Sequence, residues 1–153
     1  METVEIAKAF VAATANILST MANINPTAGN VFVKKDRDAL GDFSAIIGVT
    51  GKYRGSICVT FSREGAILVA KGMLGDDLGD IEQDIADTVG EIANMVSGQA
   101  RATIAQKGVT LHGSTPTIVV GENHRVTHLS KSPVMCIPFT MPKGSFTVEF
   151  CLE

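Results

Sequence analysis

One short pattern occurs twice in this chain, and the two copies lie about half a chain length apart. Residues 15–19 (ANILS) match residues 93–97 (ANMVS), 78 positions later in a chain of 153 residues. Each copy lies in an amphipathic helical stretch that is followed by β-rich segments and a hairpin-length turn. The repeat predicts one α+β domain with pseudo-two-fold symmetry and approximate halves 1–75 and 76–153. We expect long helices to pack on one face of a largely antiparallel sheet.

Hydrophobic periodicity and turn residues predict where the elements lie. Apolar residues on one face predict a helix over residues 3–22, and Ser62 is expected to cap a helix that reaches about Leu74. A longer helix is expected over about 81–106, ending before Gly108. The predicted strands cover residues 31–33, 43–50, 56–61 and the runs TPTIVVGE, VMCIPFTM and SFTVEFCL, with the segments KKDRDALGD and NHRVTHLSKS as polar connections.

The composition limits the classes of function. A net charge of −3, one Tyr and no Trp argue against a nucleic-acid binder, which needs a basic face and stacking aromatics. The first ten residues lack a basic segment before an apolar run, and no uninterrupted apolar run approaches about 18 residues. We therefore expect neither a secretory signal nor membrane insertion. Cys58, Cys136 and Cys151 are interpreted as reduced core thiols, which favours a cytoplasmic location.

The long helix over 81–106 has two distinct faces. Asp87, Glu91, Asn94 and Gly98 fall together opposite an apolar stripe, so they are predicted to face solvent. Polar residues in such a place are ordinary, but Gly98 costs about 1 kcal/mol of helix propensity relative to alanine. The absence of a side chain there leaves room for another molecule beside Asn94. The stripe itself consists of Ile81, Ile85, Val89, Ile92, Val96 and Ala100.

The segment DTVGEIANMVSG, followed by Pro116, resembles the signature of the CheC/CheX/FliY group of bacterial chemotaxis phosphatases. In that signature an Asp or Ser, a Glu and an Asn are separated by three and two residues, and a Pro follows. Asp87, Glu91 and Asn94 fit this spacing, while 21 residues separate Asn94 from Pro116, one fewer than the pattern has. The resemblance extends over essentially the whole chain.

One departure distinguishes members of this group. CheC-type members carry a Glu and an Asn in both duplicated helices, whereas here Asn16 is preceded three residues earlier by Ala13. The chain therefore resembles the CheX type, which has a single active helix. Asn16 is then expected to be a relic or a structural cap.

The resemblance implies that the substrate is the phosphoaspartate of a CheY-like response-regulator receiver domain. Asn94 would orient the attacking water, and Glu91 would dock against a lysine of the receiver. Asp87, Gly98 and Pro116 would support docking. The chain would need no metal or cofactor of its own, because the receiver is expected to bind Mg²⁺. The resemblance also implies a homodimer through β-strands, for which the apolar C-terminal strands are the expected edge.

Other constellations have simpler explanations. His124 and His128 have a spacing that binds zinc on a helix, but they lie in a predicted polar loop. The acidic segment GDDLGD lacks the spacing of a calcium loop, and GVTGKYRG is not a phosphate-binding loop. The alternative function is a non-catalytic receiver-binding or flagellar-switch-like scaffold. The sequence identifies neither the receiver, nor its two-component pathway, nor the dimer geometry.

Overall fold

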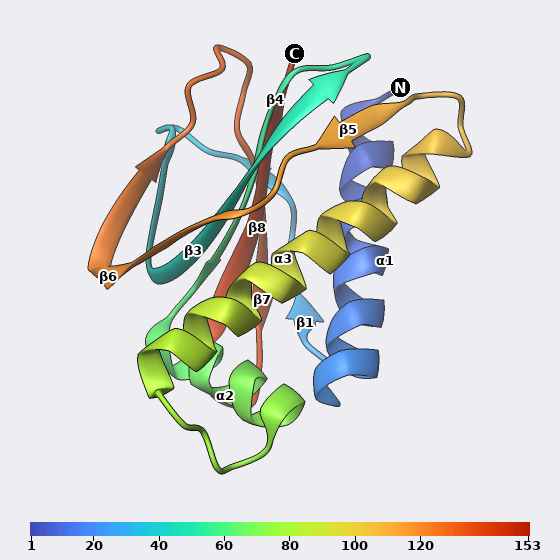
Figure 1. Cartoon of the computed structure of the whole chain (residues 1–153). Helices are drawn as coiled ribbons and strands as arrows, with labels where there is room; N and C mark the ends of the chain where they lie inside the picture. The colour runs from blue at the N-terminus through green and yellow to red at the C-terminus, as the bar shows by residue number, and fades with distance from the viewer.

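The computed structural model describes residues 1–153 as three helices packed against one antiparallel sheet of eight strands (Figure 1). This arrangement confirms the predicted α+β class. The helices are α1 (Thr3–Ala22), α2 (Arg63–Leu74) and α3 (Ile81–Ala105). The strands are β1 (Thr27–Ala28), β2 (Phe32–Val33), β3 (Asp38–Gly51), β4 (Gly55–Phe61), β5 (Leu111–Gly113), β6 (Thr117–Thr127), β7 (Met135–Thr140) and β8 (Ser145–Leu152).

The strand order is symmetric about the centre of the sheet. It runs β1-β7-β8-β4-β3-β5, with β2 also on β7 and β6 also on β3. The β3–β4 and β7–β8 hairpins meet along β4 and β8, which pair from Gly55 with Leu152 to Phe61 with Phe146. Each hairpin takes its outer strand from the other part of the chain, because β6 pairs with β3 and β2 pairs with β7. This symmetric order is compatible with the predicted pseudo-two-fold arrangement.

The helix ends follow the local sequence signals. The Ser62 hydroxyl accepts a hydrogen bond from the Gly65 backbone N–H at 3.1 Å, which confirms the predicted cap of α2. Asp80 caps α3 in the same way by accepting from the Gln83 N–H at 3.3 Å. Gly108, just beyond α3, has a φ of +88°, a left-handed conformation that suits glycine.

The core lies between the helices and the sheet. In α3, the stripe from Ile85 to Ala100 is fully buried, as predicted. Ile81 is the exception, with 51% of its surface exposed, because the first turn of the helix projects beyond the core. Phe10 of α1 stacks on Phe150 of β8 with ring centroids 5.2 Å apart, which fixes α1 against the sheet.

Helix α1 is the single helix whose length and composition would allow it to cross a membrane. Core helices and N-terminal signal sequences meet the same criterion. Here one side of α1 belongs to the core, since Phe10, Ala13 and Leu18 are at most 1% exposed.

Parts of two predicted connections are in fact strands. Residues 38–42 begin β3, and residues 123–127 complete β6 by pairing across to them, from His124 opposite Gly41 to Thr127 opposite Asp38. Backbone pairing between two polar segments leaves no apolar alternation in the sequence, which explains the error.

The expected edge strand is also corrected. β8 lies inside the sheet between β7 and β4, and β7 is covered by β1 and β2. The long strand with one unpaired side is β6, which pairs with β3 alone.

Candidate functional site

The polar face of α3 lies on the surface, as predicted. Asp87, Glu91 and Asn94 are exposed, whereas Gly98 is half-buried. This orientation follows from the burial of the opposite stripe, because residues three or four apart share a face of a helix.

A surface depression of about 410 Å³ joins this face to the start of β6. Asp87, Glu91, Asn94 and Pro116 all line it, and Gly98 lies outside it. The chain between β5 and β6, which carries Pro116, runs beside α3 (Figure 1). The fold therefore brings together the four residues of the signature although 21 residues of sequence separate Asn94 from Pro116. The remaining lining residues are Ala86, Gly90, Thr115 and Ile118.

The side chains of Glu91 and Asn94 make no hydrogen bond or ion pair within the chain. Asp87 differs, because its carboxylate accepts a hydrogen bond from Gln83 Nε2 at 2.8 Å. A free amide both donates and accepts, and a free carboxylate accepts only. The depression therefore presents one neutral and one anionic group, both available to another molecule.

Glycine plays two different parts along α3. A Cβ at Gly90 would lie 2.9 Å from Ile118 Cδ1, so Gly90 lets the helix approach β6 closely. A Cβ at Gly98 would meet nothing nearer than Arg101 Nη2 at 4.0 Å, so the space beside it is open. Gly90 was not predicted as part of the site. Its signal in the sequence was a costly helix-interior glycine directly before Glu91.

Asn16, the counterpart of Asn94 in α1, has a structural contact. Its amide donates to Gln99 Oε1 at 2.9 Å and so links α1 to α3. Ala13, which stands where the second helix has Glu91, is 1% exposed and belongs to the core. Helix α1 therefore carries no equivalent of the site on α3.

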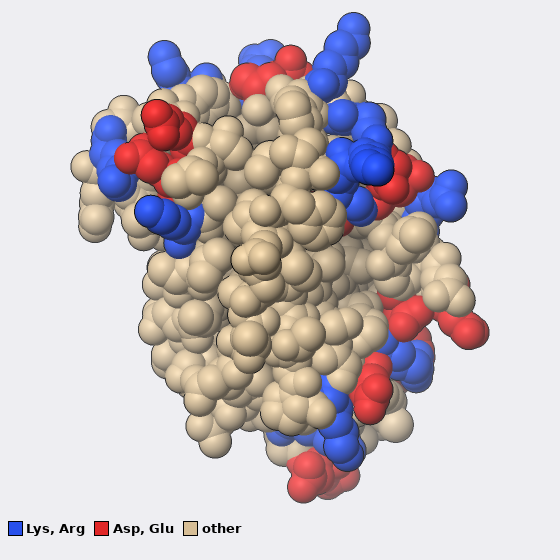
Figure 2. All heavy atoms as spheres, turned by 180° about the vertical axis from the view of Figure 1, so that it is seen from behind, with Lys and Arg blue, Asp and Glu red and all other residues tan.

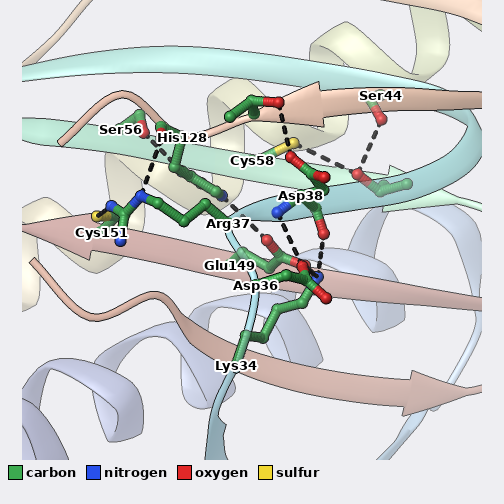
Figure 3. A network of polar contacts seen from close by, with 12 residues as sticks. Lys34, Asp36, Arg37, Asp38, Ser44, Ser56, Cys58, His128, Glu149 and Cys151 are labelled. Atoms are coloured by element: carbon green, nitrogen blue, oxygen red, sulfur yellow. Dashed lines mark hydrogen bonds and ion pairs between the residues drawn. The ribbon is translucent and has the colours of Figure 1, made fainter. Parts of the chain in front are cut away.

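A second polar cluster lies on the face of the sheet that the helices do not cover (Figure 3). Glu149 of β8 is 1% exposed, and its two oxygens accept from Lys34 Nζ and His128 Nε2, both at 3.0 Å. Because His128 Nε2 donates to a carboxylate, its Nδ1 accepts from the Ser56 hydroxyl at 2.7 Å. Lys34 already neutralises the carboxylate, as a buried charge requires.

This cluster corrects the prediction of an exposed loop at the two histidines. His128 is 3% exposed, and His124 instead contacts the Ser44 hydroxyl through Nε2 at 2.6 Å. The two rings therefore serve different partners and do not share a site. Arg37 donates to the His128 carbonyl at 3.2 Å and to Cys151 Sγ at 3.1 Å, which ties the segments before β3 and after β6 to the sheet.

The ionisable groups of the cluster respond to burial in different ways. Burial opposes the charged form of Lys34, but the hydrogen bond and the charge of Glu149 outweigh it and leave the pKa of Lys34 raised. Burial raises the pKa of the Cys58 thiol to about 11 and that of Cys136 to about 12. All three cysteines are free and buried, as predicted.

The charged residues are unevenly distributed over the surface. Seen from behind the view of Figure 1, the middle of the molecule carries no Lys, Arg, Asp or Glu, and these residues gather at the rim (Figure 2). Helix α3, which carries Glu91, lies toward the viewer in Figure 1, so the candidate site and this uncharged face occupy different sides of the molecule.

Comparisons with known proteins give a matching family and similar structures. The family model of chemotaxis phosphatase CheX matches residues 43–140. The crystal structure of a chemotaxis protein CheX from Desulfovibrio desulfuricans is 56% identical, with a TM-score of 0.94, and the match covers 97% of this chain and 99% of that chain.

Two more distant proteins have the same fold or family. CheY-P phosphatase CheX of Thermotoga maritima is 23% identical over 122 residues, 79% of each chain. The CheX–CheY–BeF3–Mg²⁺ complex from Borrelia burgdorferi contains a chain that is 22% identical, with a TM-score of 0.79, and the match covers 96% of this chain and 97% of that chain. The family match and the close Desulfovibrio relative together show that this chain belongs to the CheX family of chemotaxis phosphatases.

Proposed function

We propose that this chain is a phosphatase that speeds hydrolysis of the phosphoaspartate on a CheY-like response-regulator receiver. The observation that carries this proposal is the pair of exposed, unpartnered side chains of Glu91 and Asn94 beside the depression lined by Pro116. Two relatives support it. The Thermotoga maritima protein is named as a CheY-P phosphatase, and the Borrelia burgdorferi protein was crystallised with CheY, BeF3 and Mg²⁺.

Asn94 holds the attacking water in line with the phosphorus. An acyl phosphate is already reactive, so the phosphatase has only to position one water and needs no nucleophile of its own. An amide suits this task because it donates and accepts hydrogen bonds without repelling the phosphoryl oxygens. The free amide of Asn94 can take up a water without first breaking a contact within the chain.

Glu91 docks the receiver by pairing with a lysine near the phosphorylated aspartate. It lies three residues before Asn94, so the two side chains are neighbours on one face of α3. Asp87 adds negative charge one turn earlier, and Gly98 keeps the next turn clear. Pro116 lines the same depression from the chain between β5 and β6.

The Mg²⁺ of the reaction belongs to the receiver, where it neutralises charge on the transferred phosphoryl group. The chain supplies no metal ligand and no cofactor in this scheme. Its place of action is the cytoplasm, where receiver domains work.

One assay tests this function. Decay of a phosphorylated CheY-type receiver from the same organism is followed alone, with this protein, and with its Asn94→Ala variant. We expect faster decay with the wild-type chain and the spontaneous rate with the variant. Binding of the beryllofluoride-loaded receiver should be retained in both. Binding without acceleration by the wild-type chain would instead identify a receiver-binding scaffold.

The assembly is a homodimer through β-strands, which keeps two active helices apart. The unpaired side of β6 supports this geometry, because an exposed strand edge invites pairing with a second chain. Val120 of β6 is 43% exposed. Val120→Lys places a charge on this edge and should shift the mass measured by light scattering from dimer to monomer. A wild-type chain that is monomeric at micromolar concentration would contradict the dimer.

A further inference from the structure

Arg101 continues the line of the candidate site along α3. Asp87, Asn94 and Arg101 are spaced seven residues apart, so they drift by only about 20° per step around the helix. Successive members lie about 10 Å apart along its axis. On this line an acidic side chain, Asp87, precedes Asn94, and a basic one, Arg101, follows it.

The Arg101 guanidinium is held in a defined place. Its Nε donates to the Ser97 hydroxyl at 3.1 Å. A Cβ built on Gly113 of β5 would lie 2.9 Å from Nε and 3.0 Å from Cζ, so the absence of a side chain at Gly113 makes room for the guanidinium. Its Nη2 lies 4.0 Å from the position of a Gly98 Cβ. The side chain thus runs back over the turn between Asn94 and itself, the usual direction in a helix.

This guanidinium has no anionic partner in the chain. None of the salt bridges involves Arg101, whereas Arg63 pairs with Glu82 at 2.6 Å. Of the five N–H donors of a guanidinium, the Ser97 contact uses one. Fixing a long side chain costs conformational entropy, and here no ion pair offsets it. An oriented cation beside an open glycine position is a site prepared for an anion.

We propose that Arg101 binds a carboxylate of the phosphorylated receiver, on the far side of Asn94 from the lysine that Glu91 engages. This inference rests on the proposed phosphatase function and adds a second docking residue to it. A planar guanidinium suits a carboxylate because it can donate two parallel hydrogen bonds. Opposite charges on either side of Asn94 allow the receiver to dock in one orientation only. In the reversed orientation the receiver lysine would face Arg101 and its carboxylate would face Glu91, so like charges would repel.

The test compares Arg101→Ala with Gly113→Ala in the receiver-dephosphorylation assay. Arg101→Ala removes the charge, and Gly113→Ala keeps the charge but displaces it. We expect Arg101→Ala to raise KM about tenfold at low salt, with kcat at saturating receiver unchanged and a weaker dependence of KM on ionic strength. Gly113→Ala should raise KM in the same direction. Lys71→Ala, on the exposed end of α2, removes an equal charge elsewhere and should leave KM unchanged.

The outcomes separate this inference from the phosphatase function itself. Wild-type KM and salt dependence for Arg101→Ala, together with loss of activity in Asn94→Ala, would overturn the role of Arg101 alone. A lower melting temperature with unchanged KM would make Arg101 a structural brace for β5 and would also overturn it. If the wild-type chain does not accelerate receiver dephosphorylation at all, the proposed phosphatase function itself is refuted.

Discussion

Helices α1 and α3 carry the two copies of the repeated sequence pattern but present different chemistry. Both carry an asparagine at the matching position. Asn16 is engaged with Gln99 at 2.9 Å, whereas the Asn94 amide has no partner. Ala13 is buried where Glu91 is exposed. Under the proposed mechanism α1 cannot act as a site, because the Asn16 amide is engaged and no acid lies beside it.

The surface hollows beside the two helices differ in the same way. The hollow next to α1 has about 450 Å³ and is lined mainly by apolar side chains, including Val4, Val11, Val31 and Met135. The depression next to α3 has about 410 Å³ and carries Asp87, Glu91 and Asn94. The two hollows are therefore similar in volume, but only the one beside α3 carries charged and amide side chains suited to a charged partner.

The most direct test of the difference between the helices introduces on α1 the glutamate–asparagine pair that α3 carries. Ala13→Glu restores the spacing but places a carboxylate in the core, because Ala13 is 1% exposed. We expect a loss of about 3 kcal/mol in the free energy of unfolding, measured by urea denaturation. Ala15→Glu, at an exposed position of the same helix, should change stability by less than about 0.5 kcal/mol. A stable Ala13→Glu chain with doubled activity would show that α1 is a latent site.

The second test replaces each of the two asparagines by alanine and compares the variants in the dephosphorylation assay. Asn94→Ala should remove an acceleration of about a hundredfold, which corresponds to about 2.7 kcal/mol. Asn16→Ala should leave the rate unchanged, because its amide serves Gln99. The measurement is the rate at which a phosphorylated receiver loses its phosphoryl group in the presence of equal concentrations of each variant. Equal rates for the two variants would remove the distinction between the helices.

A charge reversal on α3 should affect docking more than chemistry. Glu91→Lys places a cation opposite the receiver lysine, and we expect the dissociation constant of the beryllofluoride-loaded receiver to rise at least about tenfold. Titration calorimetry at low salt measures it. Glu64→Lys makes the same reversal on α2, away from the depression, and should bind normally. A normal dissociation constant for Glu91→Lys would refute the docking role.

The smallest expected effect concerns stability. Asn16→Ala removes an exposed hydrogen bond between α1 and α3 and should lower the free energy of unfolding by about 0.5–1 kcal/mol. Asn94→Ala removes no contact and should leave it unchanged. Parallel urea titrations of the two variants provide the measurement, and a larger loss in Asn94→Ala would mean that its amide has a structural task.

Much of the fold could be predicted because its signals are local. The helix limits, the Ser62 cap, the β3–β4 hairpin and the solvent-facing strip on α3 all follow from periodicity and turn residues. The placement of His128 and Glu149 did not follow, because a buried polar residue is recognised only through partners distant in sequence. Arg101 could not be predicted for the same reason, because the position of its side chain on α3 depends on Gly113 of β5.

The order of the strands in the sheet could not be predicted from the sequence either. The C-terminal run SFTVEFCL is apolar whether it lies at an edge or in the middle, and only its pairing with both β4 and β7 decides between them. The candidate site depends less on this order, since α3 supplies Asp87, Glu91 and Asn94 from a single helix.

The exchange of outer strands between the two parts of the sheet has a consequence for folding. Since β6 lies on β3 and β2 lies on β7, neither half of the sequence can complete its share of the sheet alone. The arrangement is comparable to a domain swap in which both partners belong to the same polypeptide. Unfolding should then be a single cooperative event. A chain cut between α2 and α3 should regain its structure only when both fragments are refolded together.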